Sequence, residues 1–70
     1  MIESLRTGDV VVTSSKSGKY TQVGIVIEEV RETFVVDRVQ PAVRVEYPRG
    51  QFGLEGSVTF YETEDRIVAR

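Results

Sequence analysis

Alternation of apolar and polar positions runs through most of the chain and predicts β-strands. Its clearest form is in residues 42–47, where Val43, Val45 and Tyr47 share one face of a strand. The same period of two recurs within residues 20–31. The pattern predicts strands over residues 9–13, 20–31, 33–38, 42–47, 57–61 and 66–70. No stretch has the periodicity of a helix of normal length, so we expect an all-β fold.

Turn-forming residues separate these predicted strands. A loop rich in serine, glycine and lysine occupies residues 14–19, and Arg31-Glu32 is expected to form a tight turn. Pro41 is expected to end a strand, because proline has no N–H to donate to a central ladder. The alternation breaks at residues 28–30, which indicates a β-bulge or sharp bend in a long second strand. The pattern as a whole favours a small barrel of five or six short antiparallel strands.

The pattern also predicts which side chains form the core. Three consecutive valines leave the face of the first strand undefined, and we expect Val10 and Val12 inside because two of the three are then buried. Other residues expected to face inward are Leu5, Phe34, Val36, Val58 and Phe60. Phe52 and Leu54 are expected to anchor the irregular segment 48–56 onto the barrel.

The composition limits the class of protein. Seventy residues, 40% of them hydrophobic, predict one domain over residues 1–70, with a small core that a homodimer would help to stabilise. The chain has no cysteine and no histidine, which excludes disulfides and thiolate metal sites and fits a cytoplasmic protein. No segment approaches the ~20 apolar residues of a membrane span, and the first six residues are too short and too acidic for a signal peptide. We expect no metal, no cofactor and no membrane partner.

Enzyme activity is not expected either. Without histidine or cysteine the chain lacks the usual base and nucleophile that act near neutral pH. A barrel of 70 residues also has little room for a substrate pocket of its own. Nine Lys and Arg against eleven Asp and Glu give a formal net charge of -2, which supplies no electrostatic attraction to nucleic acid or anionic lipid.

The opening unit resembles the KOW-type, SH3-like barrel family. The matching residues are Gly8-Asp9 with the valine run that follows, and the step Gly24-Ile25-Val26 in the second strand. The resemblance covers residues 6–30 and implies a small SH3-like barrel that serves as a docking module for RNA, DNA or protein. In such barrels, aromatic residues near the first loop and the closing turn often line the ligand groove. Tyr20 and Tyr61 flank polar residues and are the better surface candidates in this chain, whereas Tyr47 and Phe52 are expected in the core or on a strand face.

Six residues are candidates for contact with a ligand: Lys16, Lys19, Tyr20, Arg38, Arg44 and Tyr61. Lysines in a serine-rich loop can contact phosphate or an acidic partner. Arg38 and Arg44 are expected to lie near each other if the strands on either side of Pro41 pair. The competing interpretation is a solvated loop, with the arginines in weak cross-strand pairs to Glu28, Asp37 and Glu46.

Two main functional hypotheses follow. The first is a non-enzymatic module that docks a protein partner, or copies of itself, through sheet edges and the loops 14–21 and 48–56. The alternative is a nucleic-acid-binding accessory domain of KOW type, which would use the candidate lysines, arginines and Tyr20. A third hypothesis is a subunit of a symmetric oligomer that lines a shared small-molecule pocket at an axis.

Overall fold

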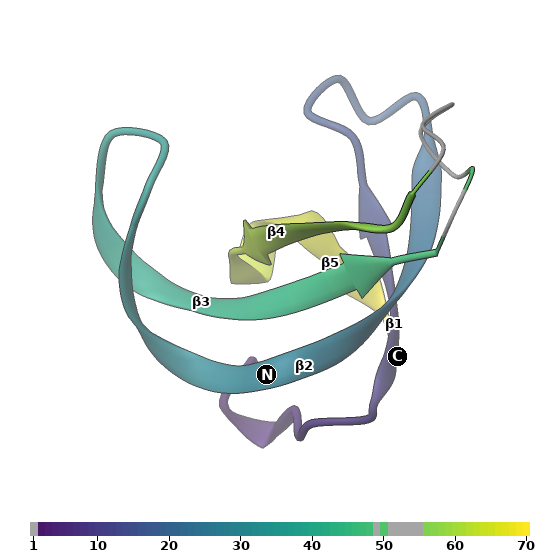
Figure 1. Cartoon of the computed structure of the whole chain (residues 1–70). Helices are drawn as coiled ribbons and strands as arrows, with labels where there is room; N and C mark the ends of the chain where they lie inside the picture. The colour runs from purple at the N-terminus through teal and green to yellow at the C-terminus, as the bar shows by residue number, and fades with distance from the viewer. Residues whose placement is uncertain (1, 49, 51–55) are drawn as a thin grey trace.

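A computed structural model describes residues 2–48, 50 and 56–70 as one curved antiparallel sheet (Figure 1). Its strands are β1 (Val10–Ser14), β2 (Thr21–Val35), β3 (Arg38–Tyr47), β4 (Val58–Glu62) and β5 (Ile67–Ala69). Short 3₁₀ turns, η1 (Ile2–Ser4) and η2 (Glu64–Arg66), lie at the start of the chain and before β5. The predicted all-β class is confirmed, with five antiparallel strands. The predictions for Phe52 and Leu54 lie outside the described residues.

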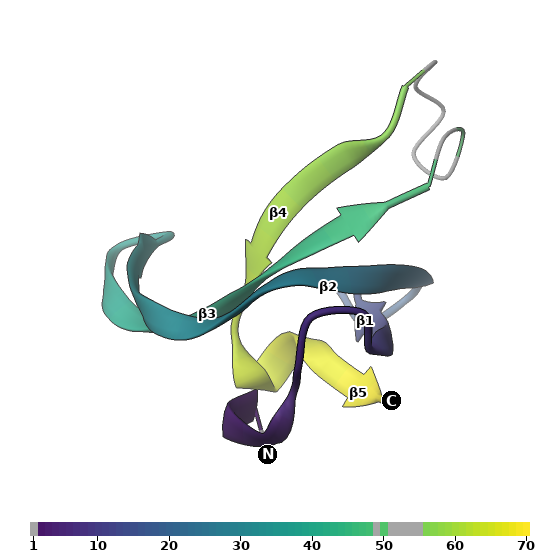
Figure 2. The ribbon, with the colours of Figure 1, turned by 60° about the horizontal axis from the view of Figure 1, so that its bottom comes forward.

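The strands follow one another as neighbours, except for the last. Their order in the sheet is β4-β3-β2-β1-β5, so β5 returns to pair with β1. The outer strands are therefore β4 and β5, which η2 connects, and no ladder joins them within residues 2–48, 50 and 56–70. Figure 2 shows how far the β2–β3 hairpin projects from the body of the sheet.

The core lies on the concave side of the sheet. Its buried residues are Ile2, Leu5, Val11, Val26, Val43, Val45 and Tyr47, with Val30, Val58 and Ile67 packed against them. Each fully buried aliphatic or aromatic side chain stabilises the fold by about 1.5–3 kcal/mol. The predicted burial of Leu5 is confirmed, since the segment with η1 lies against the core.

The connection between β2 and β3 differs from the prediction. Arg31 and Glu32 do not turn, because both belong to a ladder that continues to the pair Val35–Arg38. Pro41 lies within β3, opposite Glu32. Proline is compatible with this position because β4 pairs only with residues 43–47, so β3 is an edge strand at Pro41. The predicted strand 33–38 thus contains the end of β2, the turn at Val36-Asp37 and the first residue of β3, whereas the predicted strand 42–47 is the second part of β3.

The prediction of a bulge in the second strand is confirmed. The register of β2 against β3 shifts between Val26 and Glu28, and again between Glu28 and Arg31. Bulges increase the local twist and bend the bulged strand. The bend is visible in Figure 1, where β2 and β3 curve together around the core.

The face of β1 is opposite to the prediction. Val11 is fully buried, whereas Val10 is 52% exposed and Val12 is half-buried. Val11 lies across from Gly24 of β2. A Cβ built on Gly24 would lie 2.4 Å from Val45 Cγ1, so the missing side chain lets β2 approach β3 closely. Val11 takes the inward position above this close contact.

The predicted inward residues of the hairpin and of β4 are exposed. Phe34 and Val36 are 66% and 83% exposed, because the hairpin beyond the bulges pairs only with itself and lies outside the core. Phe60 is 49% exposed and covers only the edge of the core, with its ring centroid 6.1 Å from that of Tyr47. Val58 is half-buried against the core, in agreement with its predicted face.

No helix in the described part of the chain is long and apolar enough to cross a membrane.

Candidate binding groove

A groove lies between three segments that are distant in the sequence. They are the β1–β2 loop, the tip of the β2–β3 hairpin, and the end of β4 with the turn that follows it. The groove consists of two adjoining pockets of about 310 and 330 Å³. Both pockets are lined by Lys16, Val35, Val36, Tyr61, Glu62 and Arg66. Pockets that hold a ligand usually start at about 300 Å³, so the groove is large enough to accept a small ligand or several side chains of a larger one.

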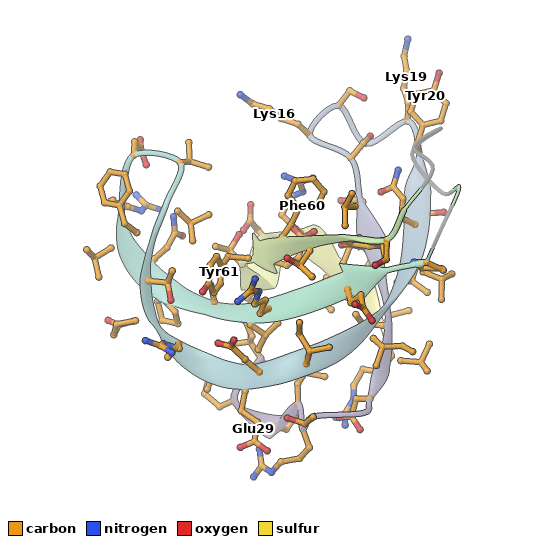
Figure 3. All side chains as sticks on the ribbon, in the orientation of Figure 1. Lys16, Lys19, Tyr20, Glu29, Phe60 and Tyr61 are labelled. Carbon is orange, nitrogen blue, oxygen red and sulfur yellow. The ribbon has the colours of Figure 1, made fainter. Side chains whose placement is uncertain are left out.

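Large apolar side chains lie open in this groove. Val36 is 83% exposed, Phe60 49% and Tyr61 36%. Figure 3 shows Phe60 on one side of β4 and Tyr61 on the other, with Lys16 on the β1–β2 loop above them. An exposed apolar patch bordered by polar groups is typical of a surface that a ligand covers.

Cationic side chains stand at the rim of the groove. Lys16 comes from the β1–β2 loop and Arg38 from the start of β3, and neither makes an ion pair within the described residues. Arg66 is fixed instead, because its Nε donates to the carbonyl of Ser14 at 2.7 Å. Asp65 accepts a hydrogen bond from the Thr63 hydroxyl. The unpaired charges at the rim therefore include two cations, Lys16 and Arg38.

A buried hydrogen-bond chain supports the floor of the groove. The Tyr47 hydroxyl donates to Glu62 Oε2, and Thr13 Oγ1 lies 2.6 Å from the Tyr47 hydroxyl oxygen. Burial, and then the hydrogen bond to the Glu62 carboxylate, raise the pKa of Tyr47 well above its ordinary value. These hydrogen bonds link β1, β3 and β4, and the Tyr47 ring that makes them is also in contact with Phe60.

Three of the six predicted contact residues meet in the groove: Lys16, Arg38 and Tyr61. Lys19 and Tyr20 do not line it; they occupy the other end of the same loop (Figure 3). Tyr20 is nonetheless 66% exposed, so its predicted surface position is confirmed.

The predicted proximity of Arg38 and Arg44 is wrong. Both residues belong to the single strand β3, Arg38 in its first pair with β2 and Arg44 further along, instead of to two facing strands. The Arg44 guanidinium pairs with Glu28 at 3.2 Å and lies 5.6 Å from the Tyr61 ring centroid. Its second nitrogen donates to the Thr59 hydroxyl at 3.2 Å. The interpretation of a cross-strand pair therefore holds for Arg44, which also lies across from Tyr61 on the same face of the sheet.

The sequence pattern missed other residues of the groove. Phe60 was expected in the core and Val36 inside the barrel, and Arg66 was given no role. The adjacent pair Phe60-Tyr61 before an acidic turn is a signal that could have pointed to β4, because an alternating strand can bury only one of two successive rings. No pattern indicated Val36, since its turn has none of the usual turn residues.

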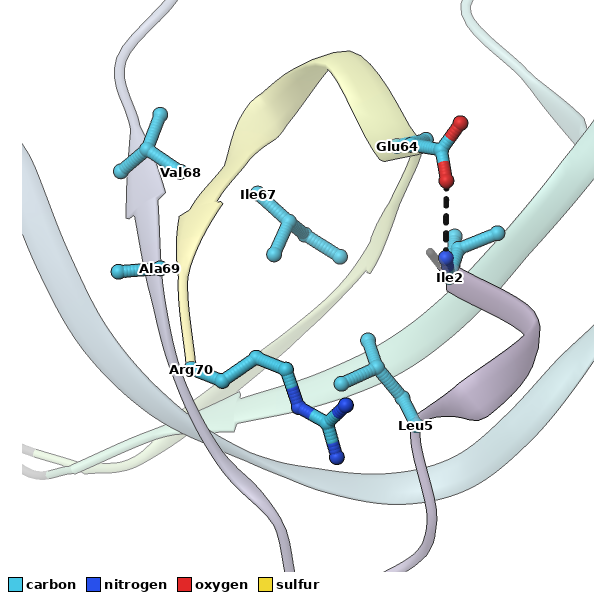
Figure 4. A pocket seen from close by; sticks show the side chains of 7 residues that line it. All are labelled: Ile2, Leu5, Glu64, Ile67, Val68, Ala69 and Arg70. Atoms are coloured by element: carbon cyan, nitrogen blue, oxygen red, sulfur yellow. Dashed lines mark hydrogen bonds between the residues drawn. The ribbon is translucent and has the colours of Figure 1, made fainter.

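A separate, smaller pocket of about 190 Å³ lies between η1 and β5 (Figure 4). Leu5 and Ile67 contribute apolar walls, and the Ile2 amide donates to Glu64 Oε1 at 2.9 Å across one end. Arg70 at its edge already bonds Ser4 Oγ at 3.0 Å and Asp9 Oδ2 at 3.1 Å. These hydrogen bonds link the N-terminal segment to the last residues of the chain. The larger groove is therefore the better candidate site.

Among residues 2–48, 50 and 56–70, no group of three or more acidic side chains is placed to hold a metal ion. The chain matches no protein-family model, and no curated protein or solved structure is significantly similar to it. The argument for function therefore rests on the groove itself.

Proposed function

We propose that this chain is a non-enzymatic, SH3-like docking module that binds an extended segment of a protein partner in the groove. The observation that carries the proposal is that Lys16, Val36 and Tyr61 line both of two adjoining pockets, with Arg38 in one pocket and the exposed Phe60 in the other. Aromatic and apolar anchors surrounded by charged groups are the usual composition of a protein-binding site.

An extended segment fits the surroundings of the groove. β4 is an outer strand of the sheet, and its last three residues line the groove. An outer strand offers unpaired backbone N–H and C=O groups, to which an extended peptide can add as a further strand. Main-chain hydrogen bonds would then supply affinity, while side chains in the two pockets would supply specificity.

Nucleic acid is the second candidate, favoured by the cations and aromatic rings that share the groove. Acidic groups oppose it, because Asp37, Glu62 and Asp65 line the same pocket as Lys16 and Arg38. A nucleic-acid strand carries a charge at every phosphate and would meet these carboxylates. A peptide can place single charges where the groove has partners for them, so the protein ligand is preferred.

Selection from a library of random peptides displayed on phage tests the proposal. We expect enriched peptides, resynthesised with a fluorescent label, to bind the protein and to bind Tyr61→Ala about tenfold more weakly, because one aromatic contact is lost. Tyr20→Ala is the matched control, since Tyr20 is an exposed tyrosine outside the groove. Equal binding to all three proteins, or a library without enriched peptides, would overturn the proposal.

A further inference from the structure

The tip of the β2–β3 hairpin has an unusual backbone. Val35 pairs with Arg38, so only Val36 and Asp37 form the connection. Val36 has φ 64°, and no other non-glycine residue in the described ranges has a positive φ. The Val35 carbonyl accepts hydrogen bonds from the Asp37 amide at 2.8 Å and from Gln40 Nε2 at 3.0 Å, which hold the turn closed.

Valine is a poor residue for this conformation. A positive φ at the first position of a two-residue hairpin connection normally selects glycine. For a β-branched side chain the left-handed region is strongly disfavoured, because the branched Cβ collides with the backbone. The fold gains little in return, since the Val36 side chain is 83% exposed and outside the core. Strain of this kind is characteristic of sites that act on a ligand.

We propose that Val36 is a specificity-determining residue whose strained backbone presents an aliphatic side chain to the ligand, and that the ligand is an extended peptide with one apolar residue flanked by acidic residues. This inference rests on the proposed docking function. The position of Val36 supports it, because the residue lines both pockets of the groove, together with Tyr61 in both and Phe60 in one. An apolar side chain of the ligand in these pockets would lie among these side chains.

The acidic flanks follow from the unpaired cations at the rim. Lys16 and Arg38 border the groove from the β1–β2 loop and from the hairpin, and neither has an ionic partner in the described part of the chain. A carboxylate on either side of the apolar residue would meet one of them. Charge-assisted hydrogen bonds to carboxylates are the strongest contacts these two side chains offer.

Short fluorescein-labelled peptides test both parts of the proposal. The reference probe has one leucine flanked on each side by glutamates; in matched probes glutamine replaces the glutamates or serine replaces the leucine. We expect the reference probe to bind the protein at least tenfold more tightly than either matched probe. We expect Val36→Asn to weaken its binding about tenfold, because asparagine adopts a positive φ readily but lacks the aliphatic contact.

The control variant is Val39→Asn. Val39 is another exposed valine of the same hairpin, 61% exposed, and it lines neither pocket. Urea unfolding should show a higher midpoint for Val36→Asn than for the unchanged protein, with no such rise for Val39→Asn. If Val36→Asn is more stable than the unchanged protein but binds the probe less tightly, the strained backbone at Val36 contributes to binding. Unfolding of the variant could not then explain the weaker binding.

The outcomes separate this inference from the proposed function. Peptide binding that is sensitive to Tyr61→Ala but unchanged in Val36→Asn would overturn the role of Val36 and leave the docking function in place. Equal binding of the glutamate and glutamine probes would overturn the proposal that acidic residues flank the apolar residue of the ligand. Absence of any binding sensitive to Tyr61→Ala would overturn both proposals.

Discussion

Gly24 leaves the space on β2 that Val45 and Tyr47 of β3 occupy. A methyl group there would lie 2.4 Å from Val45 Cγ1 and 3.0 Å from the Glu46 carbonyl oxygen, a backbone atom that cannot rotate away. Gly24→Ala should therefore lower the free energy of unfolding by about 1–3 kcal/mol, as overpacked cores do. Urea denaturation followed by circular dichroism measures the change. Gly56→Ala is the matched control, because nothing lies within 4 Å of its added Cβ; an equal loss in both variants would contradict the steric cause.

Tyr47 makes stability depend on pH at the alkaline end. Its pKa is raised in the folded protein, first by burial and then by the Glu62 carboxylate. Unfolded tyrosine loses its proton above about pH 10. Above that pH the unfolded chain releases a proton that the folded chain retains, so the free energy of unfolding falls as pH rises. Below pH 10 both states are protonated and this contribution is fully present.

Tyr47→Phe removes the hydroxyl that donates to Glu62 Oε2. At neutral pH we expect the variant to be less stable by about 1–3 kcal/mol, because a buried carboxylate loses its donor. Above pH 10 its stability should fall less steeply than that of the unchanged protein. Urea unfolding at a series of pH values tests both statements, with Thr13→Val as a variant that removes only the second partner. Parallel pH curves for the protein and Tyr47→Phe would show that another group carries the dependence.

The sequence predicted the inward-facing residues correctly where a strand is paired on both sides and one of its faces is buried in the core. Val43, Val45 and Tyr47 alternate cleanly and are fully buried, because β3 lies between β2 and β4 over this stretch. The bulge near Glu28 was visible as a broken period. The alternation of apolar and polar positions thus indicated the all-β class, and its break indicated the bend in β2.

The hairpin between β2 and β3 could not be predicted from local signals. Turn residues at Arg31-Glu32 and Pro41 suggested breaks, whereas the chain turns at Val36-Asp37. A two-residue hairpin connection is normally recognised in a sequence by glycine or asparagine at the position with a positive φ. Here a valine occupies that position. The conflict between local preference and observed turn coincides with the proposed binding site, where such conflicts are expected.

Across the whole molecule, the groove depends on contacts that no sequence pattern describes. Lys16, Arg38 and Tyr61 lie far apart in the chain, and they meet because β2 bends and carries the hairpin tip back toward β4 and the β1–β2 loop. Half of the contact residues predicted from the sequence thus line the groove, but the sequence pattern did not predict how they are arranged. It placed Arg38 beside Arg44 because the two strands were divided at the wrong turn.

The net charge of the chain distinguishes a peptide ligand from a nucleic acid. With nine basic and eleven acidic residues, the protein as a whole repels a polyanion, and the groove has three cations without an ion pair in the described residues, Lys16, Arg38 and Arg66. For single-stranded nucleic acid, the logarithm of the binding constant falls with the logarithm of the salt concentration, with a slope of about -0.7 for each phosphate neutralised. Three cations therefore give a slope no steeper than about -2.

We therefore expect a labelled single-stranded RNA of mixed sequence to bind weakly at physiological salt and to show this shallow slope at low salt. Fluorescence anisotropy across a salt series measures it, with the glutamate-flanked peptide as the comparison ligand. Lys16→Ala should weaken peptide binding, whereas Lys19→Ala, outside the groove, should leave it unchanged. A much steeper slope for RNA, reduced by Lys16→Ala and Lys19→Ala alike, would instead identify the whole β1–β2 loop as a nucleic-acid contact and favour the KOW-type function over peptide docking.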